Sequence, residues 1–401
     1  MTRPIYDLII VGAGMAGASL AIALRNSNLK IALVEATEMR THSQPSYDDR
    51  GIALTYGSQR IFETMGIWSK IQDHTTAIKT IHVSDRGHFG VTRLSAEHEK
   101  VPALGQVITA KILGQTLNEQ LSTQENLDII CPVTVSSVQP HDDSVSLTLT
   151  NNEMLTTRLL VAADGRDSTI RHYLDMTSSE QQYGQVAVTA NVTTDQAHKG
   201  MAYERFTASG PLALLPLSSD RSSLVWTVKT GEEDELLSLS DEDFLTTLQQ
   251  AFGYRAGRFI KVGQRQSYPL TMMQADNPVH DRVVLIGNAA HSLHPIAGQG
   301  FNLGLRDVAV LAEQIFNAND CGNAAVLADY QHWRQADQDD VVKSTDRLVK
   351  LFSNNISLIA HGRSAGLAIM DCLPMLKHQL AQKSMGMSQH HPKLSRGIPL
   401  S

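Results

Sequence analysis

Cysteine is scarce in this chain of 401 residues, which contains only Cys131, Cys321 and Cys372. An odd and widely scattered set of three indicates neither a disulfide framework nor a cysteine metal site. We therefore expect a reducing compartment and a core that is held together by packing alone. No bound metal is predicted either, because His291 and His294 share a loop with no carboxylate or third ligand nearby.

Long apolar runs and an excess of positive charge are also missing. No uncharged apolar stretch reaches about 18 residues, so we expect no membrane-spanning helix and no secretory leader. The formal net charge is −7 and the sequence has no basic stripe, which argues against nucleic acid as a partner. The expectation is a cytoplasmic protein, with peripheral contact at the inner face of the membrane as an open alternative.

The chain does contain three glycine-centred motifs, each of which follows an apolar run that predicts a buried parallel strand. In the first, Gly12 permits a tight turn, Gly14 lets a pyrophosphate approach the backbone, and Gly17 lets helix and strand pack closely. Glu35 then follows a second predicted strand, at a distance that suits both hydroxyls of an adenosine ribose. A carboxylate there disfavours a 2′-phosphate, so the predicted dinucleotide is FAD or NAD.

The second motif, Asp164-Gly165, follows the apolar run 159–163. A polar turn at the carboxyl end of a parallel strand is the usual place for a ligand in open α/β sheets. Asp164 could equally cap the short predicted helix that contains Ile170, and the sequence leaves both interpretations open.

The third motif begins with Asn288 at the end of a predicted strand and continues through Pro295 to Gly298 and Gly300. The Asn288 amide can exchange hydrogen bonds with a ribityl or ribose hydroxyl. A helix is predicted from about Asn302, and its N-terminus would favour negative charge on a reduced flavin ring. Together the three motifs indicate one bound flavin.

In this order the motifs resemble those of the FAD-dependent aromatic hydroxylases, the group that includes para-hydroxybenzoate hydroxylase. Within that group the chain is most similar to the ubiquinone-biosynthesis branch, and in it to enzymes that hydroxylate 2-polyprenyl-6-methoxyphenol. Most of the wider group has aspartate at the position of Asn288, and asparagine is characteristic of the 6-methoxyphenol enzymes. The matching stretches are spread over nearly the whole chain, at 47–54, 81–88, 103–107, 204–206, 210–216 and 294–304.

The resemblance implies that NAD(P)H visits transiently and reduces FAD, and that O2 then forms a flavin C4a-hydroperoxide. This species would hydroxylate the polyprenylated phenol to 2-polyprenyl-6-methoxy-1,4-benzoquinol, in association with other ubiquinone-biosynthesis proteins. Arg50 has an alternative role, as the partner of Asp48 or Asp49 in a surface ion pair. The implied FAD contacts are Gly12, Gly14, Gly17, Glu35, Arg50, Gln106, Asp164, Gly165, Asn288, Pro295, Gly298, Gly300 and Asn302.

No catalytic base follows from the sequence. Tyr203, His88 and Glu204 lie in segments that could face the substrate, but packing or surface roles are the stronger interpretation for each. Two other activities remain open: a sister hydroxylase that acts at another ring carbon, and a flavin-dependent dehydrogenase or reductase that inserts no oxygen. The intact glycine motifs and Glu35 disfavour a scaffold flavoprotein without activity.

The expected fold class is α/β. A Rossmann-like FAD-binding domain of the para-hydroxybenzoate hydroxylase type is interleaved with an antiparallel-sheet substrate domain and followed by helices. The apolar face of these helices is predicted either to contact the membrane or a partner and guide the prenyl tail, or to pack on the FAD-binding domain. The boundaries are 1–75, 100–182 and 276–323 for FAD binding, 76–99 and 183–275 for the substrate domain, 324–388 for the helical region, and 389–401 for a flexible tail.

Overall fold

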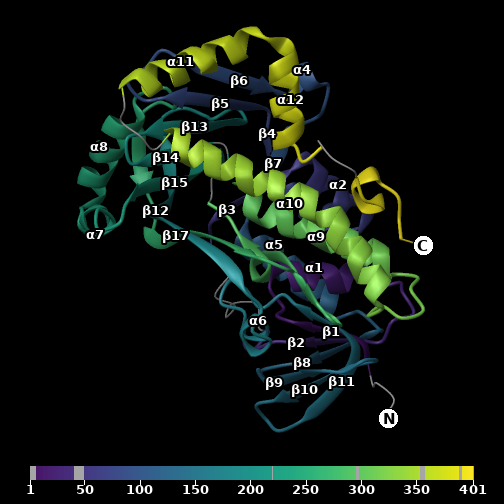
Figure 1. Cartoon of the computed structure of the whole chain (residues 1–401). Helices are drawn as coiled ribbons and strands as arrows, with labels where there is room; N and C mark the ends of the chain where they lie inside the picture. The colour runs from purple at the N-terminus through teal and green to yellow at the C-terminus, as the bar shows by residue number, and fades with distance from the viewer. Residues whose placement is uncertain are drawn as a thin grey trace.

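The computed structural model describes residues 6–39, 49–218, 220–294, 298–352, 357–387 and 391–400. Its first sheet contains adjacent parallel strands in the order β19, β11, β1, β2, β8, with β18 at one end and the β9–β10 hairpin attached to β11 (Figure 1). The bounds are β1 Tyr6–Val11, β2 Ile31–Val34, β8 Leu127–Ile130, β9 Val135–Pro140, β10 Val145–Leu149, β11 Met154–Ala162, β18 Val279–His280 and β19 Val283–Leu285.

The central strands β1, β2 and β19 and the second half of β11 are buried on both faces, which explains why they appear in the sequence as apolar runs. On β1, Leu8 and Ile10 pack into the core under the helices, whereas Ile9 and Val11 pack into a second core on the opposite face. The helices packed together over the first face are α1 Met15–Ala23, α5 Ala110–Leu121 and α9 Gln299–Ile315.

The second sheet has nine strands in the order β20, β17, β12, β15, β14, β13, β5, β6, with β16 paired to β12. Six strands and two helices lie in the stretch where four or five strands and one helix are expected. The short helix α7 was missed. The run Ser240-Asp-Glu-Asp243 in the sequence resembles a capping box and predicts one helix over 241–252, and α8 does begin there, with the Ser240 hydroxyl accepting a hydrogen bond from the Asp243 amide. The bounds are β5 Thr80–Asp85, β6 Val91–Ser95, β12 Ser178–Thr194, β13 Met201–Thr207, β14 Gly210–Pro216, β15 Arg221–Lys229, β16 Phe259–Val262, β17 Gln266–Ala275, β20 His291–Ser292, α7 Glu233–Ser238 and α8 Asp241–Phe252.

A third sheet has three strands, in the order β3, β7, β4. Residues 76–78 were predicted to belong to the substrate domain together with β5. They form β4, which pairs with β7 of the third sheet and not with β5. The bounds are β3 Gly51–Thr55, β4 Thr76–Ile78 and β7 Gly105–Thr109, with the short helices α2 Tyr56–Thr64, α3 Trp68–Ile71, α4 Ala96–Glu99 and α6 Thr169–Tyr173 and the 3-10 turns η1 Gln72–His74 and η2 Gly287–Ala289.

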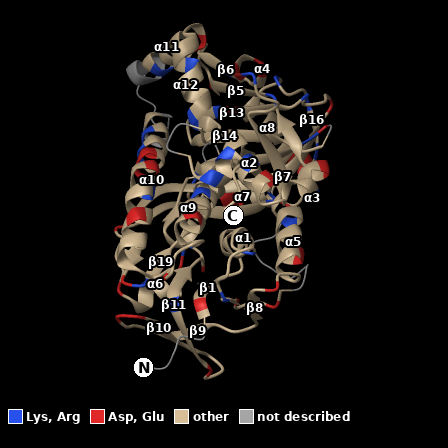
Figure 2. Ribbon diagram, turned by 90° about the vertical axis from the view of Figure 1, so that its right-hand side faces the viewer, with Lys and Arg blue, Asp and Glu red and all other residues tan. Residues whose placement is uncertain are grey.

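Three helices follow: α10 Ala324–Phe352, α11 Ser357–Cys372 and α12 Pro374–Ser384. The long helix α10 packs on α9 of the parallel-sheet layer and extends toward the second sheet (Figures 1 and 2). Helix α11 lies along β6, where the Thr92 hydroxyl donates to the Leu367 carbonyl and the Gly90 amide donates to Ser364. None of the described helices combines the length and the apolar character needed to cross a bilayer.

The expectation of a loose tail is wrong for residues 391–400. The turn η4 Lys393–Arg396 packs against α2, and Leu394 and Leu400 are buried in the main core. The Arg60 guanidinium donates to the Ser395 carbonyl, and the Thr64 hydroxyl donates to the Leu394 carbonyl. The sequence did not predict this packing, because the burial of the two leucines depends on a surface formed by residues far away in the sequence.

Candidate functional site

The carboxyl ends of four adjacent parallel strands bring the predicted motifs together. Gly12 follows β1, Glu35 follows β2, Asp164 comes two residues after β11, and Gly287 comes two residues after β19. Because neighbouring strands in a parallel sheet run in the same direction, these residues all lie at one edge. This edge is the ligand-binding side of an open α/β sheet.

Two of the three glycines of the first motif are closely packed against the backbone, and the third borders open space. A Cβ on Gly12 would lie 2.5 Å from the Ala163 carbonyl oxygen, and one on Gly17 would lie 2.0 Å from the Gly12 carbonyl oxygen. A Cβ on Gly14, in contrast, would meet nothing within 4 Å. Gly14 caps the N-terminus of α1, so the helix directs unpaired N–H groups at this open space, as an anion such as a pyrophosphate requires.

Glu35 is buried beside this turn. One carboxylate oxygen accepts a hydrogen bond from the Ala13 amide at 2.6 Å, and the other accepts from the Thr37 amide at 2.9 Å. These bonds fix the carboxylate against the glycine turn. Each oxygen keeps a further lone pair, with which it could accept a hydrogen bond from a ribose hydroxyl.

Asp164 supports the start of α6 with one carboxylate oxygen, and its role as a ligand contact stays a prediction. One carboxylate oxygen accepts from the Ile170 amide at the start of α6, although Ser168 is the capping residue of that helix. Its other oxygen, Oδ1, is buried, and no donor in the described part of the chain reaches it. Gly165 has a φ of +91° and open space beside it, so Asp164 and Gly165 could face a ligand at this edge.

The third motif lies beside the start of α9, which begins three residues earlier than predicted, at Gln299. Asn288 is exposed, while Gly298 has a φ of +60° and Gly300 faces open space. The first turn of α9 contains no acidic side chain, so no carboxylate of that turn offsets the partial positive charge of this helix end. Pro295 lies outside the described residues.

The Asn302 side chain makes three hydrogen bonds within the protein. Its amide nitrogen donates to the Ala53 and Gly298 carbonyls, and its oxygen accepts from the Thr55 amide. It therefore fastens β3 to the start of α9. The FAD contact that the resemblance implies for Asn302 stays a prediction.

The two remaining predicted residues come from the three-stranded sheet and the segment before it. The Arg50 guanidinium lies over the ring of Tyr268 on β17, 4.4 Å from the ring centroid, which is a cation–π contact between the two parts of the molecule. The Gln106 side-chain oxygen accepts from the Thr75 hydroxyl at 3.2 Å.

A cavity of about 930 Å³ lies between the motif edge and the nine-stranded sheet. Asn288, Gly298 and Gly300 border it on one side, and helices α10, α11 and α12 contribute Leu348, Leu367 and Leu380 on the other, respectively. The residues that line it are mainly apolar. A mainly apolar cavity of this size with few polar groups is typical of a small-molecule site.

Sequence reasoning missed a buried charge cluster behind the third motif. Asp307 is 0% exposed and accepts from the Gly287 amide, from His291 Nε2 at 2.6 Å and from Arg334 Nε at 2.8 Å. Burial alone would raise the pKa of Asp307, but His291 and Arg334 outweigh that effect and hold this pKa below its ordinary value. The sequence does contain one signal for this cluster, since Asp307 lies on the apolar face of a predicted helix. A carboxylate at such a position predicts buried positively charged partners.

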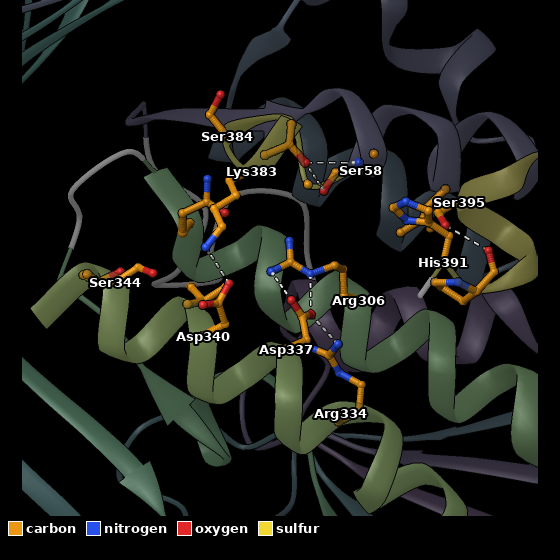
Figure 3. Close-up of a pocket in the computed structure, with 18 of the residues that line it drawn as sticks. Ser58, Arg306, Arg334, Asp337, Asp340, Ser344, Lys383, Ser384, His391 and Ser395 are labelled. Carbon is orange, nitrogen blue, oxygen red and sulfur yellow. Dashed lines mark hydrogen bonds and ion pairs between the residues drawn. The ribbon is translucent and has the colours of Figure 1, made fainter. Parts of the chain in front are cut away.

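Asp337 extends this cluster toward a smaller pocket of about 140 Å³ between α2, α9, α10 and α12. Its carboxylate receives hydrogen bonds from both Arg306 and Arg334, as Figure 3 shows. At the same pocket, Lys383 on α12 forms an ion pair with Asp340 on α10, so each of these two charges also has a partner of opposite sign. The cluster fixes α10 to α9 and, through Asp307, the backbone of the third motif.

These features define a dinucleotide-binding oxidoreductase with an apolar substrate cavity, and comparisons with known proteins identify its family. The model for the FAD binding domain family matches residues 6–345. The chain is 34% identical to the ubiquinone hydroxylase UbiL of Rhodospirillum rubrum, over 99% of this chain and 94% of that protein. It is 28% identical to the 3-demethoxyubiquinol 3-hydroxylase of Escherichia coli, over 96% of this chain and 100% of that protein.

A solved structure agrees in fold. The p-nitrophenol 4-monooxygenase PnpA from Pseudomonas putida superposes with a TM-score of 0.80 at 16% identity, covering 97% of this chain and 100% of that chain. The chain belongs to the FAD-binding family and, within it, to the flavin-dependent hydroxylases of ubiquinone biosynthesis. The predicted fold class, the enzyme class and the use of FAD with NAD(P)H are thereby confirmed. Among the described residues no cluster of His, Cys, Asp or Glu has the arrangement of a metal site.

The residues at the strand edge fit FAD. The open space at Gly14 can admit a pyrophosphate, the buried and unpartnered Asp164 oxygen can accept a hydrogen bond, and the start of α9 can face the flavin ring. All three features lie along one edge, over which an extended dinucleotide can stretch.

Replacing Gly14 by valine tests this arrangement. The new side chain meets no protein atom at its Cβ, so we expect a folded protein whose Kd for FAD rises by about 100-fold or more, since tenfold corresponds to ~1.4 kcal/mol. Flavin fluorescence titration would measure the affinity, and circular dichroism would measure folding.

Gly263→Ala is the matched control, because its Cβ would make only an ordinary contact at 3.5 Å, with the Asn191 carbonyl oxygen. Unchanged FAD affinity in Gly14→Val would contradict the placement of the pyrophosphate at this turn.

Proposed function

We propose that this protein uses NAD(P)H and O2 to hydroxylate the ring of a polyprenylated phenol, with 2-polyprenyl-6-methoxyphenol as the substrate and 2-polyprenyl-6-methoxy-1,4-benzoquinol as the product. The observation that supports this most strongly is the apolar cavity of about 930 Å³ next to the predicted flavin edge. Its lining offers a face for an aromatic ring and further apolar surface for a prenyl tail, at Leu94, Leu104, Leu215, Leu367, Met370 and Leu380.

In this proposal FAD supplies the redox chemistry, accepting a hydride from NAD(P)H and activating O2. The residues of this chain bind and orient the reactants. Gly12, Gly14 and Gly17 would hold the pyrophosphate and Glu35 the adenosine ribose. The other predicted contacts, Arg50, Gln106, Asp164, Gly165, Asn288, Gly298 and Gly300, would hold the ribityl chain and the ring, while Asn302 acts indirectly by fixing β3.

The cavity walls have a further task, which is to exclude water from the reacting oxygen. The lining is mainly apolar, and Arg50 is held against Tyr268 at the border between the two sheets. A dry, pre-shaped site limits the release of hydrogen peroxide in place of hydroxylation. Uncoupled NAD(P)H oxidation without product is therefore the expected defect when this wall is opened.

The reaction is tested by supplying 2-polyprenyl-6-methoxyphenol, NAD(P)H and ¹⁸O2 to the purified protein. We expect one labelled oxygen in the product ring, and NAD(P)H oxidation that the phenol stimulates, because a monooxygenase inserts one atom of O2. Mass spectrometry measures the label, and NMR assigns the ring carbon.

Labelled oxygen found only in water or peroxide would favour a flavin dehydrogenase or reductase. Labelling at another carbon, or only with a different prenylphenol, would favour a sister hydroxylase. The folded Gly14→Val variant serves as the control without FAD and should form no product.

We further propose that the corner between α11 and α12 contacts the membrane that holds the lipid substrate. Ile369, Leu373, Met375 and Leu376 are exposed there, Met375 by 76%. The same two helices wall the cavity, through Leu367 and other side chains, so a prenyl tail that enters at this corner would reach the active site directly. An exposed apolar patch beside a lipid-binding cavity is a feature of interfacial proteins. The neighbouring face of α11 packs on β6 of the second sheet, whereas α10 packs on α9, as the alternative of packing on the FAD-binding domain expects.

Vesicle flotation tests this contact. Met375→Asp combined with Leu376→Asp should abolish flotation with phosphatidylethanolamine–phosphatidylglycerol vesicles, because two charges would have to enter the apolar layer. Ile260→Asp, at a 58% exposed position on β16, is the matched control and should float as the unchanged protein does. Equal flotation of all three proteins, or flotation of none, would contradict the proposed contact.

A further inference from the structure

Glu204 is a carboxylate on the cavity wall. It lies on β13, where its backbone neighbours are Val83 on β5 and Ala213 on β14. All three residues line the cavity, and strand alternation directs Phe206 to the same face. Tyr203 takes the opposite direction and packs against Phe252 of α8. Glu204 therefore faces the space in which we propose that the substrate binds.

The Glu204 carboxylate has one oxygen without the partner that a buried polar atom normally has. Its Oε1 is buried, and within the described ranges no hydrogen-bond donor reaches it. The surrounding cavity face is apolar, formed by Ile81, Val83, Ala213 and Leu215. An unpaired carboxylate in such surroundings is costly to maintain, which indicates that a ligand supplies its partner.

Charged groups near this face are engaged elsewhere. Arg363 on α11 pairs with Asp85 on β5 at 3.1 Å, and both side chains are 5% exposed. Arg50 lies over Tyr268, four strands away in the sheet. The other charged groups lie on the opposite face of the sheet: His82, Arg93, Arg205 and Arg255. The pKa of His82 is lowered to about 4, mainly by burial and further by the positive charges of Arg255 and Arg93.

Burial raises the pKa of Glu204 to about 7. A carboxyl group with this pKa is ionised above neutral pH and holds a proton more strongly than an exposed glutamate does. General bases act best when their pKa lies close to the working pH, so the environment of Glu204 suits proton transfer.

We propose that Glu204 accepts a hydrogen bond from the ring hydroxyl of the bound phenol and takes its proton during hydroxylation. The phenolic O–H bond breaks, its electron pair stays on the ring oxygen, and a new O–H bond forms on the Glu204 carboxylate. The resulting phenolate is more electron-rich at its ring carbons, which promotes attack on an electrophilic oxygen. This assignment rests on the proposed function, since it requires a phenolic substrate in the cavity.

Glu204→Gln tests the proposal in the full-length protein loaded with FAD. Glutamine keeps the size of the side chain but cannot accept the proton. We expect kcat/KM for hydroxylation to fall by about 100-fold at pH 8, within the usual range for loss of a general base. The unchanged protein should lose activity as the pH falls through about 7, because protonated Glu204 is not a base, and the variant should lack this step.

Glu180→Gln is the matched control, because Glu180 is exposed on β12 of the same sheet and should leave rate and pH profile unchanged. Glu204→Asp is the second variant. Its shorter carboxylate should restore part of the rate together with the step in the pH profile, which a role in shape alone would not do.

Proton uptake gives a readout that does not depend on turnover. A carboxylate and a phenolate confined in one apolar site share a single proton, so binding of a prenylated nitrophenol at pH 8 should draw about one proton from solution. A pH-indicator dye would measure this, and Glu204→Gln should bind the probe without uptake.

Two results would overturn the assignment: a Glu204→Gln protein with unchanged rate and pH profile, or equal proton uptake by both proteins. If instead the unchanged protein holds FAD and oxidises NAD(P)H but hydroxylates no phenol, the proposed function fails. The proton-uptake comparison then still decides whether Glu204 binds a phenol.

Discussion

The shared direction of β19, β11, β1 and β2 is the constraint on which the site depends. Four segments that are separated by up to about 275 residues end at one edge only because their strands are parallel neighbours. The contact between Gly17 and the Gly12 carbonyl then sets how closely α1 approaches this edge, since any side chain at Gly17 would collide with that oxygen. A single extended dinucleotide can therefore touch all of these segments.

Buried polar groups connect this edge to the rest of the molecule. Asp307 ties the backbone of the third motif to α10 through Arg334, and Asn302 ties β3 to the start of α9. Because α10 also reaches the cavity through Leu348, the helix that helps to enclose the substrate is fixed to the backbone beside the proposed flavin ring. Breaking one partner of such a buried pair is expected to cost about 3–5 kcal/mol, since the remaining charge stays buried. The cluster thus stabilises the geometry of the site without contacting the reactants.

Local patterns in the sequence predicted those parts of the fold that local physics determines. The apolar runs of β1, β2, β11 and β19, the glycine turn before α1 and the Ser240 cap of α8 each depend on a few consecutive residues. The pairing of β4 with β7, the packing of Leu394 and the partners of Asp307 depend on surfaces that form only after distant segments meet. The same limit applies to Glu204, which was one of three candidates in the sequence. Its cavity-facing, unpartnered carboxylate became apparent only when β13 was placed between β5 and β14.

A crystal structure of the protein with oxidised FAD and 2-polyprenyl-6-methoxyphenol is the most direct test of the central claim that one flavin and one phenol meet between the two sheets. It should show the pyrophosphate at Gly14, the flavin ring between Asn288 and the start of α9, and the phenol in the large cavity with its hydroxyl toward Glu204. A flavin bound away from the strand edge, or a phenol bound outside the cavity, would contradict it.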